Sequence, residues 1–160
     1  NLLANGSLEA GIQQGWKIHI DGTLQGSVTP STTATDGDMG LRQEIFNGNG
    51  EGRIWYFTDP LIKVDPGETY DFQACVWVEK AEGIEAALRM TWRDSEGVVT
   101  PQSEILARAG ETDGFMLLQQ RGLVPHPNAE AVRVDLILFY PGKGTAAGVA
   151  YWDDVRITQR

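Results

Sequence analysis

The chain has 160 residues, of which 41% are hydrophobic and 22% are charged. This length suits one domain with its own core, and the composition excludes both a disordered chain and a membrane-spanning one. The formal net charge of −9 argues against nucleic acid and against an anionic membrane surface as partners, because both need a basic surface. Cys75 is the single cysteine, so no internal disulfide can form, and we interpret it as an inert, buried or half-buried thiol.

Apolar and polar residues alternate with a period of two along most of the chain, which predicts half-buried strands of antiparallel sheets. In chain order, strands are expected at Trp16–Ile20, Leu24–Thr29, Leu41–Phe46, Arg53–Phe57, Tyr70–Glu79, Ile84–Trp92, Phe115–Leu123, Ala131–Phe139 and Gly148–Thr158. At most one helical turn is expected, at Glu104–Gly110. Many short strands with almost no helix predict a sandwich or barrel, here one all-β domain over residues 1–160.

The two ends of the chain and two segments between them carry a recognisable pattern. The opening Asn1–Gly11 is followed by Trp16, a Pro-Gly-x-Thr-Tyr segment enters a strand within Val64–Phe72, and the chain closes on paired aspartates within Val149–Ile157. With Val124-Pro125 before the late strand, these segments resemble jelly-roll carbohydrate-binding modules of the family 4, 9, 16 and 22 group over nearly the whole chain. The resemblance implies an antiparallel β-sandwich that binds a polysaccharide without catalysis.

The resemblance also implies a setting for the module. We expect a monomer that is secreted by a bacterium and is covalently linked to a catalytic domain, a glycoside hydrolase or a polysaccharide lyase. The chain opens at Asn1 without methionine or a hydrophobic leader, so we expect that a signal peptide or an upstream domain has been removed.

Two carboxylates are candidates for a metal site. Glu9 lies near the first strand and Asp153 near the last, and a sandwich places its terminal strands side by side. Carboxylates joined by backbone carbonyls suit calcium, and the resemblance implies a structural Ca²⁺ at Glu9 and Asp153. Ser7 and the Asp36–Gly40 loop are alternative sources of backbone ligands, between which the sequence does not decide. Strand parity places Tyr151, Asp153 and Val155 on the inward face. The alternative is an aspartate pair that caps the sheet edge with hydrogen bonds.

The candidate ligand face is the polar side of three central strands. Gln73 and Trp77 lie opposite the apolar parity of Tyr70–Glu79; Arg89 belongs to the next strand; Asp135 and Phe139 belong to the late strand. If these strands share a sheet, the side chains form one polar surface with aromatic rings, on which sugars stack and form hydrogen bonds. The alternative is a solvated face with cross-strand ion pairs, on which Trp77 merely covers an edge. The arginines also suit a uronic acid or a sulfated sugar, whereas the net charge disfavours both.

The remaining aromatic residues divide between core and surface. Trp16 and Trp92 are expected in the core, as is Tyr151, whereas Trp152 is expected to be partly exposed. In the run Trp55-Tyr56-Phe57 at least one ring must face away from the core, which makes Trp55 or Tyr56 a further candidate for ligand binding.

The sequence shows no catalytic motif: it lacks a nucleophile elbow, a phosphate loop, a dinucleotide fingerprint and a paired-histidine metal motif. Two other classes of function stay open beside the binding module. One is a cell-surface adhesion or spacer sandwich without a sugar site. The other, which the sequence supports less, is a small jelly-roll polysaccharide lyase or glycosidase, whose two carboxylates the sequence does not single out.

Overall fold

The structure is a computed structural model, and it describes residues 1–21, 24–47, 52–140 and 146–160. The described residues form eleven strands and no helix. No helix in this part of the chain is long and apolar enough to cross a membrane. The predicted all-β fold class is confirmed.

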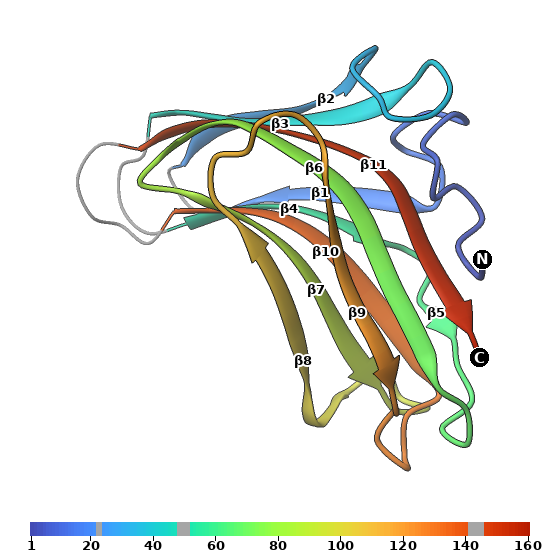
Figure 1. Ribbon diagram of the computed structural model, residues 1–160. Coiled ribbons are helices and arrows are strands. Elements are labelled where there is room, and N and C mark those ends of the chain that lie inside the picture. The colour runs from blue at the N-terminus through green and yellow to red at the C-terminus, as the bar shows by residue number, and fades with distance from the viewer. Residues whose placement is uncertain (22–23, 48–51, 141–145) are drawn as a thin grey trace.

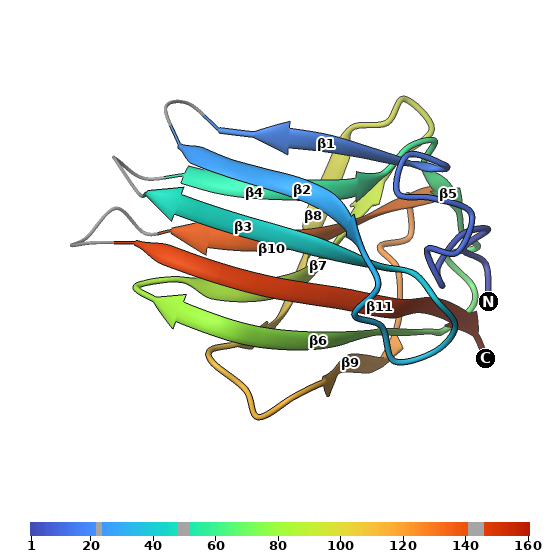
Figure 2. The ribbon, with the colours of Figure 1, turned by 90° about the horizontal axis from the view of Figure 1, so that it is seen from above.

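Two antiparallel sheets pack face to face (Figure 1). Sheet A contains, in spatial order, β1 (Trp16–Ile20), β4 (Gly52–Thr58), β10 (Ala131–Tyr140), β7 (Glu85–Arg93) and β8 (Val99–Ala109), with β5 (Ile62–Lys63) paired to β10. Sheet B contains β2 (Gln25–Ser31), β3 (Gly40–Asn47), β11 (Ala147–Gln159), β6 (Tyr70–Glu82) and β9 (Met116–Leu123), in the order seen in Figure 2. The strands of both sheets bend in the same sense, with β7 and β8 on the inner side of the bend and β11 on the outer side (Figure 1).

The core lies between the sheets and is built by the period of two. In β6 the buried positions are Tyr70, Phe72, Ala74, Val76 and Val78, and the residues between them are half buried. Alternate side chains of a strand point to opposite faces, so each strand gives one set to the core and the other to the surface. The alternation predicted for the Tyr70–Glu79 strand is therefore confirmed.

Aromatic rings pack together in two parts of the core. Trp16 stacks on Tyr56 with ring centroids 4.6 Å apart. Trp92 meets Phe72 edge to face at 5.6 Å and also packs against Tyr70. The predicted core positions of Trp16 and Trp92 are confirmed.

The prediction of a helical turn at Glu104–Gly110 is wrong. Residues 99–109 form strand β8, which pairs with β7 along most of its length. Ala107 and Ala109 are buried against the core, so this strand has the same alternation as the others. Its buried side chains, Thr100, Ser103, Ala107 and Ala109, are small or polar and give a weak apolar period, and the pairing with β7 decides the structure.

The inward parity predicted for the closing strand also fails in part. Trp152 is fully buried and Tyr151 is half buried, the reverse of the prediction. The pairing of β11 with β6 shifts register between Asp153 and Arg156, and Asp154 has a φ of 50°. This β-bulge adds one residue to the strand and so reverses the parity of the residues after it. Val155 therefore points inward, whereas Tyr151, before the bulge, does not.

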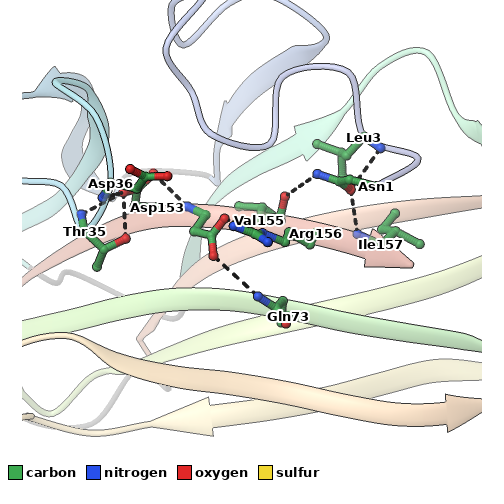
Figure 3. Close-up of polar contacts among 10 residues, drawn as sticks. Asn1, Leu3, Thr35, Asp36, Gln73, Asp153, Val155, Arg156 and Ile157 are labelled. Atoms are coloured by element: carbon green, nitrogen blue, oxygen red, sulfur yellow. Dashed lines mark hydrogen bonds and ion pairs between the residues drawn. The ribbon is translucent and has the colours of Figure 1, made fainter. Parts of the chain in front are cut away.

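The N-terminal segment lies along β11, and the two termini lie near each other at one end of the sandwich (Figures 1 and 2). The amide of Leu2 donates to the carbonyl of Ile157, and the amide of Val155 donates to the carbonyl of Gly6. The side chain of Asn1 joins the same strand: its Oδ1 accepts from the amide of Ile157 (Figure 3). These contacts tie the opening segment to the closing strand.

Candidate functional site

The structure divides the predicted ligand residues between two opposite surfaces. Trp55, Arg89, Asp135 and Phe139 lie on β4, β7 and β10, which are neighbours in sheet A. The interpretation that the Tyr70–Glu79 strand shares their sheet is wrong, because β6 belongs to sheet B. Gln73 and Trp77 therefore lie on the far side of the molecule.

The cause is a crossing between sheets that the alternation of residues does not reveal. The turn after β6, with Gly83 at a φ of 67°, connects β6 to β7. Some turns join two paired strands of one sheet, and others carry the chain into the other sheet. Both kinds of turn follow strands with the same alternation, so alternation does not distinguish them. Only the long-range pairing of β7 with β10 and β8 separates the two cases.

The centre of the outer face of sheet A is a buried carboxylate between two guanidinium groups. Asp135 is fully buried although it points away from the core. The Nε of Arg89 lies 2.8 Å from Asp135 Oδ2, and the Nε of Arg133 lies 2.8 Å from Oδ1. The register places Asp135 directly opposite both Arg89 and Phe57, so β7 and β4 flank the carboxylate. Paired in this way, Asp135 holds both arginines in place.

The same arginines surround one indole ring. The guanidinium carbons of Arg89, Arg53 and Arg133 lie 4.3, 5.2 and 5.8 Å from the centroid of Trp55. Arginine is the side chain that most often packs on aromatic faces, and Trp is the best partner for it. The indole Nε1 of Trp55 is buried and has no hydrogen-bond partner among the described residues.

Further aromatic rings extend this cluster in both directions. Arg133 lies over the ring of Phe57 at 5.0 Å, and Arg53 lies over the ring of Phe139 at 5.0 Å. We call the set Arg53, Trp55, Phe57, Arg89, Arg133, Asp135 and Phe139 the sheet A cluster. It offers flat apolar surfaces beside fixed hydrogen-bond donors, the combination that sugar rings need.

Two hollows flank the sheet A cluster. The first lies over β10, β7 and β8, and its lining includes Arg53, Arg89, Glu104, Arg108 and Phe139. The second lies over β1 and β4, and its lining includes Lys17, His19, Trp55, Phe57 and Arg133. Both hollows are lined by side chains of the outer face of sheet A, so an extended chain that crosses its strands would meet both hollows and the sheet A cluster.

Sequence reasoning missed several residues of this face. Arg53 shares the parity of Trp55 on β4, and the alternation over Gly52–Thr58 was sufficient to place it there. Glu104 and Arg108 belong to β8, the strand that was predicted as a helical turn. Their position opposite Thr91 and Ala87 follows only from the pairing of β8 with β7.

The outer face of sheet B carries a smaller aromatic group. Trp77 lies 5.2 Å from Tyr151 and 6.1 Å from Phe115, measured between ring centroids. Tyr151 donates its hydroxyl to Glu79, and Arg42 lies over the Tyr151 ring at 6.0 Å. The three rings of this group are half buried.

Gln73 takes part in the bulge of β11 rather than in the aromatic group. Its Nε2 donates to Asp154 Oδ2 at 3.4 Å, and Asp154 Oδ1 lies 2.5 Å from the Nε of Arg156 (Figure 3).

Burial and, next, the negative charge of Asp154 raise the pKa of the neighbouring Cys75 thiol. A thiol with a raised pKa is a poor nucleophile, which agrees with its interpretation as inert.

The two carboxylates predicted to bind calcium contact one loop. Thr35 donates its amide and hydroxyl to Asp153 Oδ2, at 2.7 and 2.8 Å, and the amide of Asp36 donates to the same oxygen at 3.0 Å (Figure 3). The amides of Asp38 and Met39 donate to Glu9 Oε1 at 3.0 and 2.9 Å. The loop between β2 and β3 is therefore held from both sides by carboxylates.

Calcium at this position stays a prediction. The donor set fits the ion in kind, since Glu9 and Asp153 provide carboxylate oxygens at one loop. The approach of Glu9 depends on a glycine: a Cβ on Gly37, which has a φ of 70°, would lie 2.3 Å from Glu9 Oε1. Among the described residues no group of three or more acidic, histidine or cysteine side chains is placed to hold a metal. Any further ligands would have to come from the backbone or from solvent.

Comparison with known proteins identifies the fold. No protein-family model matches the chain, and no curated protein matches it. Among solved structures, it is similar to tailspike protein 4 of bacteriophage CBA120, in its enzymatically active domain, with a TM-score of 0.79 and 14% identity. That match covers all of this chain, which spans 21% of the tailspike chain.

Two further similar structures are carbohydrate-binding modules. The family 61 module TmCBM61, in complex with β-1,4-galactotriose, has a TM-score of 0.68 and 15% identity, over 100% of this chain and 99% of that one. The C-terminal family 22 module of Clostridium thermocellum Xyn10B has a TM-score of 0.60 and 15% identity, over 97% and 94%. The fold is thus that of the jelly-roll carbohydrate-binding modules, and the resemblance seen in the sequence is confirmed at the level of the fold.

Proposed function

We propose that this chain binds a polysaccharide reversibly and without catalysis, through the outer face of sheet A. The observation that carries this proposal is the sheet A cluster, in which Trp55 and its flanking rings stand beside a fixed Arg89–Asp135 pair. Sugar rings stack on aromatic faces through their C–H groups, and their hydroxyls bond to paired charged side chains. The similar modules of matching length support the same class of function.

The position of the cluster favours sheet A over sheet B as the binding face. Sheet A lies on the inner side of the bend, and residues of the sheet A cluster line two hollows, one of which includes Trp55. On sheet B, the half-buried rings of Trp77 and Tyr151 belong to β6 and β11, which lie on the outer side of the bend. Binding sites for small ligands and sugar units are concave, which supports sheet A.

The proposed setting is an extracellular one, in a larger protein with a catalytic domain that acts on the same polysaccharide. Such a module raises the effective concentration of substrate at the catalytic domain. The two termini leave from one end of the sandwich, so a domain attached at either terminus would start away from the centre of sheet A (Figures 1 and 2). We also propose that a structural Ca²⁺ binds at Glu9 and Asp153.

The experiment that tests the binding function is affinity electrophoresis in gels that contain single polysaccharides, neutral or acidic. The wild-type chain should be retarded by at least one polymer, and Trp55→Ala should abolish that retardation. Trp77→Ala is the matched control, because it removes the same ring from the opposite face. Retardation that is lost in Trp77→Ala and kept in Trp55→Ala would overturn sheet A as the site. No retardation by any polymer would favour the spacer or adhesion interpretation.

The enzyme alternative has its own readout in the same panel. A lyase would release unsaturated sugar products and a glycosidase would release reducing ends. We expect neither from this chain after prolonged incubation with the polymers that retard it. Release of either product would overturn the non-catalytic part of the proposal.

A further inference from the structure

The outer face of sheet A holds more arginine than its carboxylates neutralise. Asp135 is shared by Arg89 and Arg133, whereas Arg53 and Arg93 have no ion-pair partner among the residues that the structure describes. The guanidinium group of Arg53 lies over the rings of Trp55 and Phe139, and Arg93 donates to the carbonyl of Gly97. This local excess of positive charge stands in a chain whose formal net charge is −9.

The excess is unfavourable in the absence of a further anion. Burial and, next, the positive charge of Arg133 lower the pKa of Arg93, and only the shared Asp135 opposes this shift. The Nε of Arg93 is buried and has no hydrogen-bond partner in the described part of the chain. Crowded cations with unused donors are stabilised when an anion binds between them.

The geometry also suits an anionic ligand. Arg53, Arg89 and Arg108 line the first hollow, where Glu104 and Glu85 pair with Arg89 and Arg108 and leave Arg53 unpaired among the described residues; Arg133 lines the second hollow, beside Trp55. Guanidinium groups that lie over aromatic rings or are tied to Asp135 are fixed in orientation, so less entropy is lost when their N–H groups bind a ligand. Planar guanidinium groups match carboxylate and sulfate oxygens two at a time.

We propose that the sheet A face binds an acidic polysaccharide, with Arg53 and its neighbours holding the carboxylate or sulfate groups while the sugar rings pack on Trp55. The proposal rests on the proposed function and names its substrate class. It differs from the neutral galactotriose bound by the similar family 61 module. The acidic residues elsewhere on the chain act weakly at this face, because salt screens charges beyond about 8 Å at physiological ionic strength.

Isothermal titration calorimetry with three polymers tests the proposal. Polygalacturonate presents carboxylates, a carrageenan presents sulfates, and an uncharged galactan presents neither. We expect binding to one or both acidic polymers, with no measurable binding to the galactan at the same concentration. Affinity should fall as NaCl is raised from about 50 to about 500 mM, since the contacts are ionic. Carboxylate and sulfate recognition are separated by which acidic polymer binds more tightly.

Variants of Arg53 test its role without removing a partner of Asp135. Arg53→Gln should weaken binding of the preferred acidic polymer about tenfold, the typical loss for one charge-assisted contact. Arg53→Lys keeps the charge but loses the planar donor group, so its affinity should lie between that of the wild type and that of Arg53→Gln. Arg121→Gln is the matched control, because Arg121 is exposed on β9 in sheet B, and its affinity should equal that of the wild type.

The outcomes separate this proposal from the function on which it rests. Tight binding of the galactan that is lost in Trp55→Ala but unchanged in Arg53→Gln would overturn the acidic ligand while the sugar-binding function stands. Equal losses in Arg53→Gln and Arg121→Gln would show a response to net charge alone and would overturn the role of the face. If no polymer in the panel binds, the proposed function fails together with the inference.

Discussion

Asp135 is the residue on which the polar surface of sheet A depends. It occupies an outward position of β10, yet its side chain has no exposed area because Arg89 and Arg133 cover it. A buried carboxylate is costly unless cations and hydrogen bonds compensate for it. The two arginines are therefore held at the surface by a carboxylate that is itself inaccessible from the surface.

Replacing this carboxylate by a neutral isostere should destabilise the fold. In Asp135→Asn both guanidinium groups lose their counter-charge, and the free energy of unfolding should fall by about 3 kcal/mol. Glu104→Gln is the control, because it breaks the exposed pair of Arg89 and Glu104 at 3.5 Å and should change stability by less than about 0.5 kcal/mol. Urea denaturation of both variants measures the difference, and equal losses would contradict the central role of Asp135.

Cys75 offers a pH-dependent test at the residue scale. Its pKa is raised by burial first and by the charge of Asp154 next, so at pH 8 a smaller fraction is thiolate than in an unfolded chain. Alkylation by iodoacetamide should be slower in the folded protein, and its rate should rise only at higher pH. In Asp154→Asn the pH at which the alkylation rate rises should move down, towards that of an ordinary cysteine. A profile identical to that of the urea-unfolded chain would contradict this assignment.

At the scale of the elements, the opening segment depends on a close approach to the last strand. Gly6 accepts a hydrogen bond from the amide of Val155, and a Cβ on Gly6 would lie 1.9 Å from the carbonyl oxygen of Val155. Neither backbone can move without breaking the pairing between the N-terminal segment and β11. A side chain at this position must therefore displace the whole segment.

Gly6→Ala should lower the free energy of unfolding by about 2 kcal/mol, within the range typical of overpacking. Gly110→Ala is the matched control, because a Cβ there meets nothing within 4 Å and its φ lies outside the left-handed region. The control should leave stability unchanged or raise it slightly, since alanine restricts the unfolded chain. Thermal denaturation of both variants checks the difference, and an unaffected Gly6→Ala would contradict the close approach.

The sequence predicted nine of the strands because alternation is a local property. It missed β8, whose buried side chains are small or polar and give a weak apolar period, and β5, which has two residues. The burial of Tyr151 and Trp152 is the reverse of the prediction because the bulge at Asp153 and Asp154 changes the inward and outward parity within the strand. A bulge is set by its partner strand and by the loop it contacts, neither of which is encoded in the period of two.

The candidate site was predictable in residue type but not in assembly. Trp55, Arg89, Asp135 and Phe139 meet on one face because β4, β10 and β7 are neighbours, and that order is a long-range property. Trp77 has the same local pattern and lies on the opposite face, because the chain changes sheet after β6. Alternation tells which side chains leave the core, but it does not tell which strands lie next to one another.

At the scale of the molecule, the loop between β2 and β3 joins the two ends of the chain. Glu9 from the opening segment and Asp153 from β11 both hold this loop, at Asp38 and at Thr35. An ion at this point would stabilise the contact among three distant segments. Carboxylates that accept amide hydrogen bonds can also do so without a metal, and the two cases differ in their response to a chelator.

We expect EDTA to lower the melting temperature of the wild-type chain and added Ca²⁺ to restore it, because an ion that binds only the folded state stabilises that state. Glu9→Gln should melt at a lower temperature and lose this response. Glu79→Gln, an exposed carboxylate on sheet B, should keep the response of the wild type. A wild-type melting temperature that is unchanged by EDTA would contradict the calcium prediction and favour direct hydrogen bonds from the loop.

The most direct measurement of the central claim is a two-dimensional ¹H–¹⁵N NMR titration of the wild-type chain. The titrant is an oligosaccharide of the polymer that retards the chain most strongly in affinity electrophoresis. We predict that the indole signal of Trp55 and the backbone signals around Asp135 and Phe139 shift with added sugar, while the indole of Trp77 does not. Shifts confined to Trp77 and its neighbours on sheet B, or no shifts at saturating sugar, would contradict binding by the sheet A face.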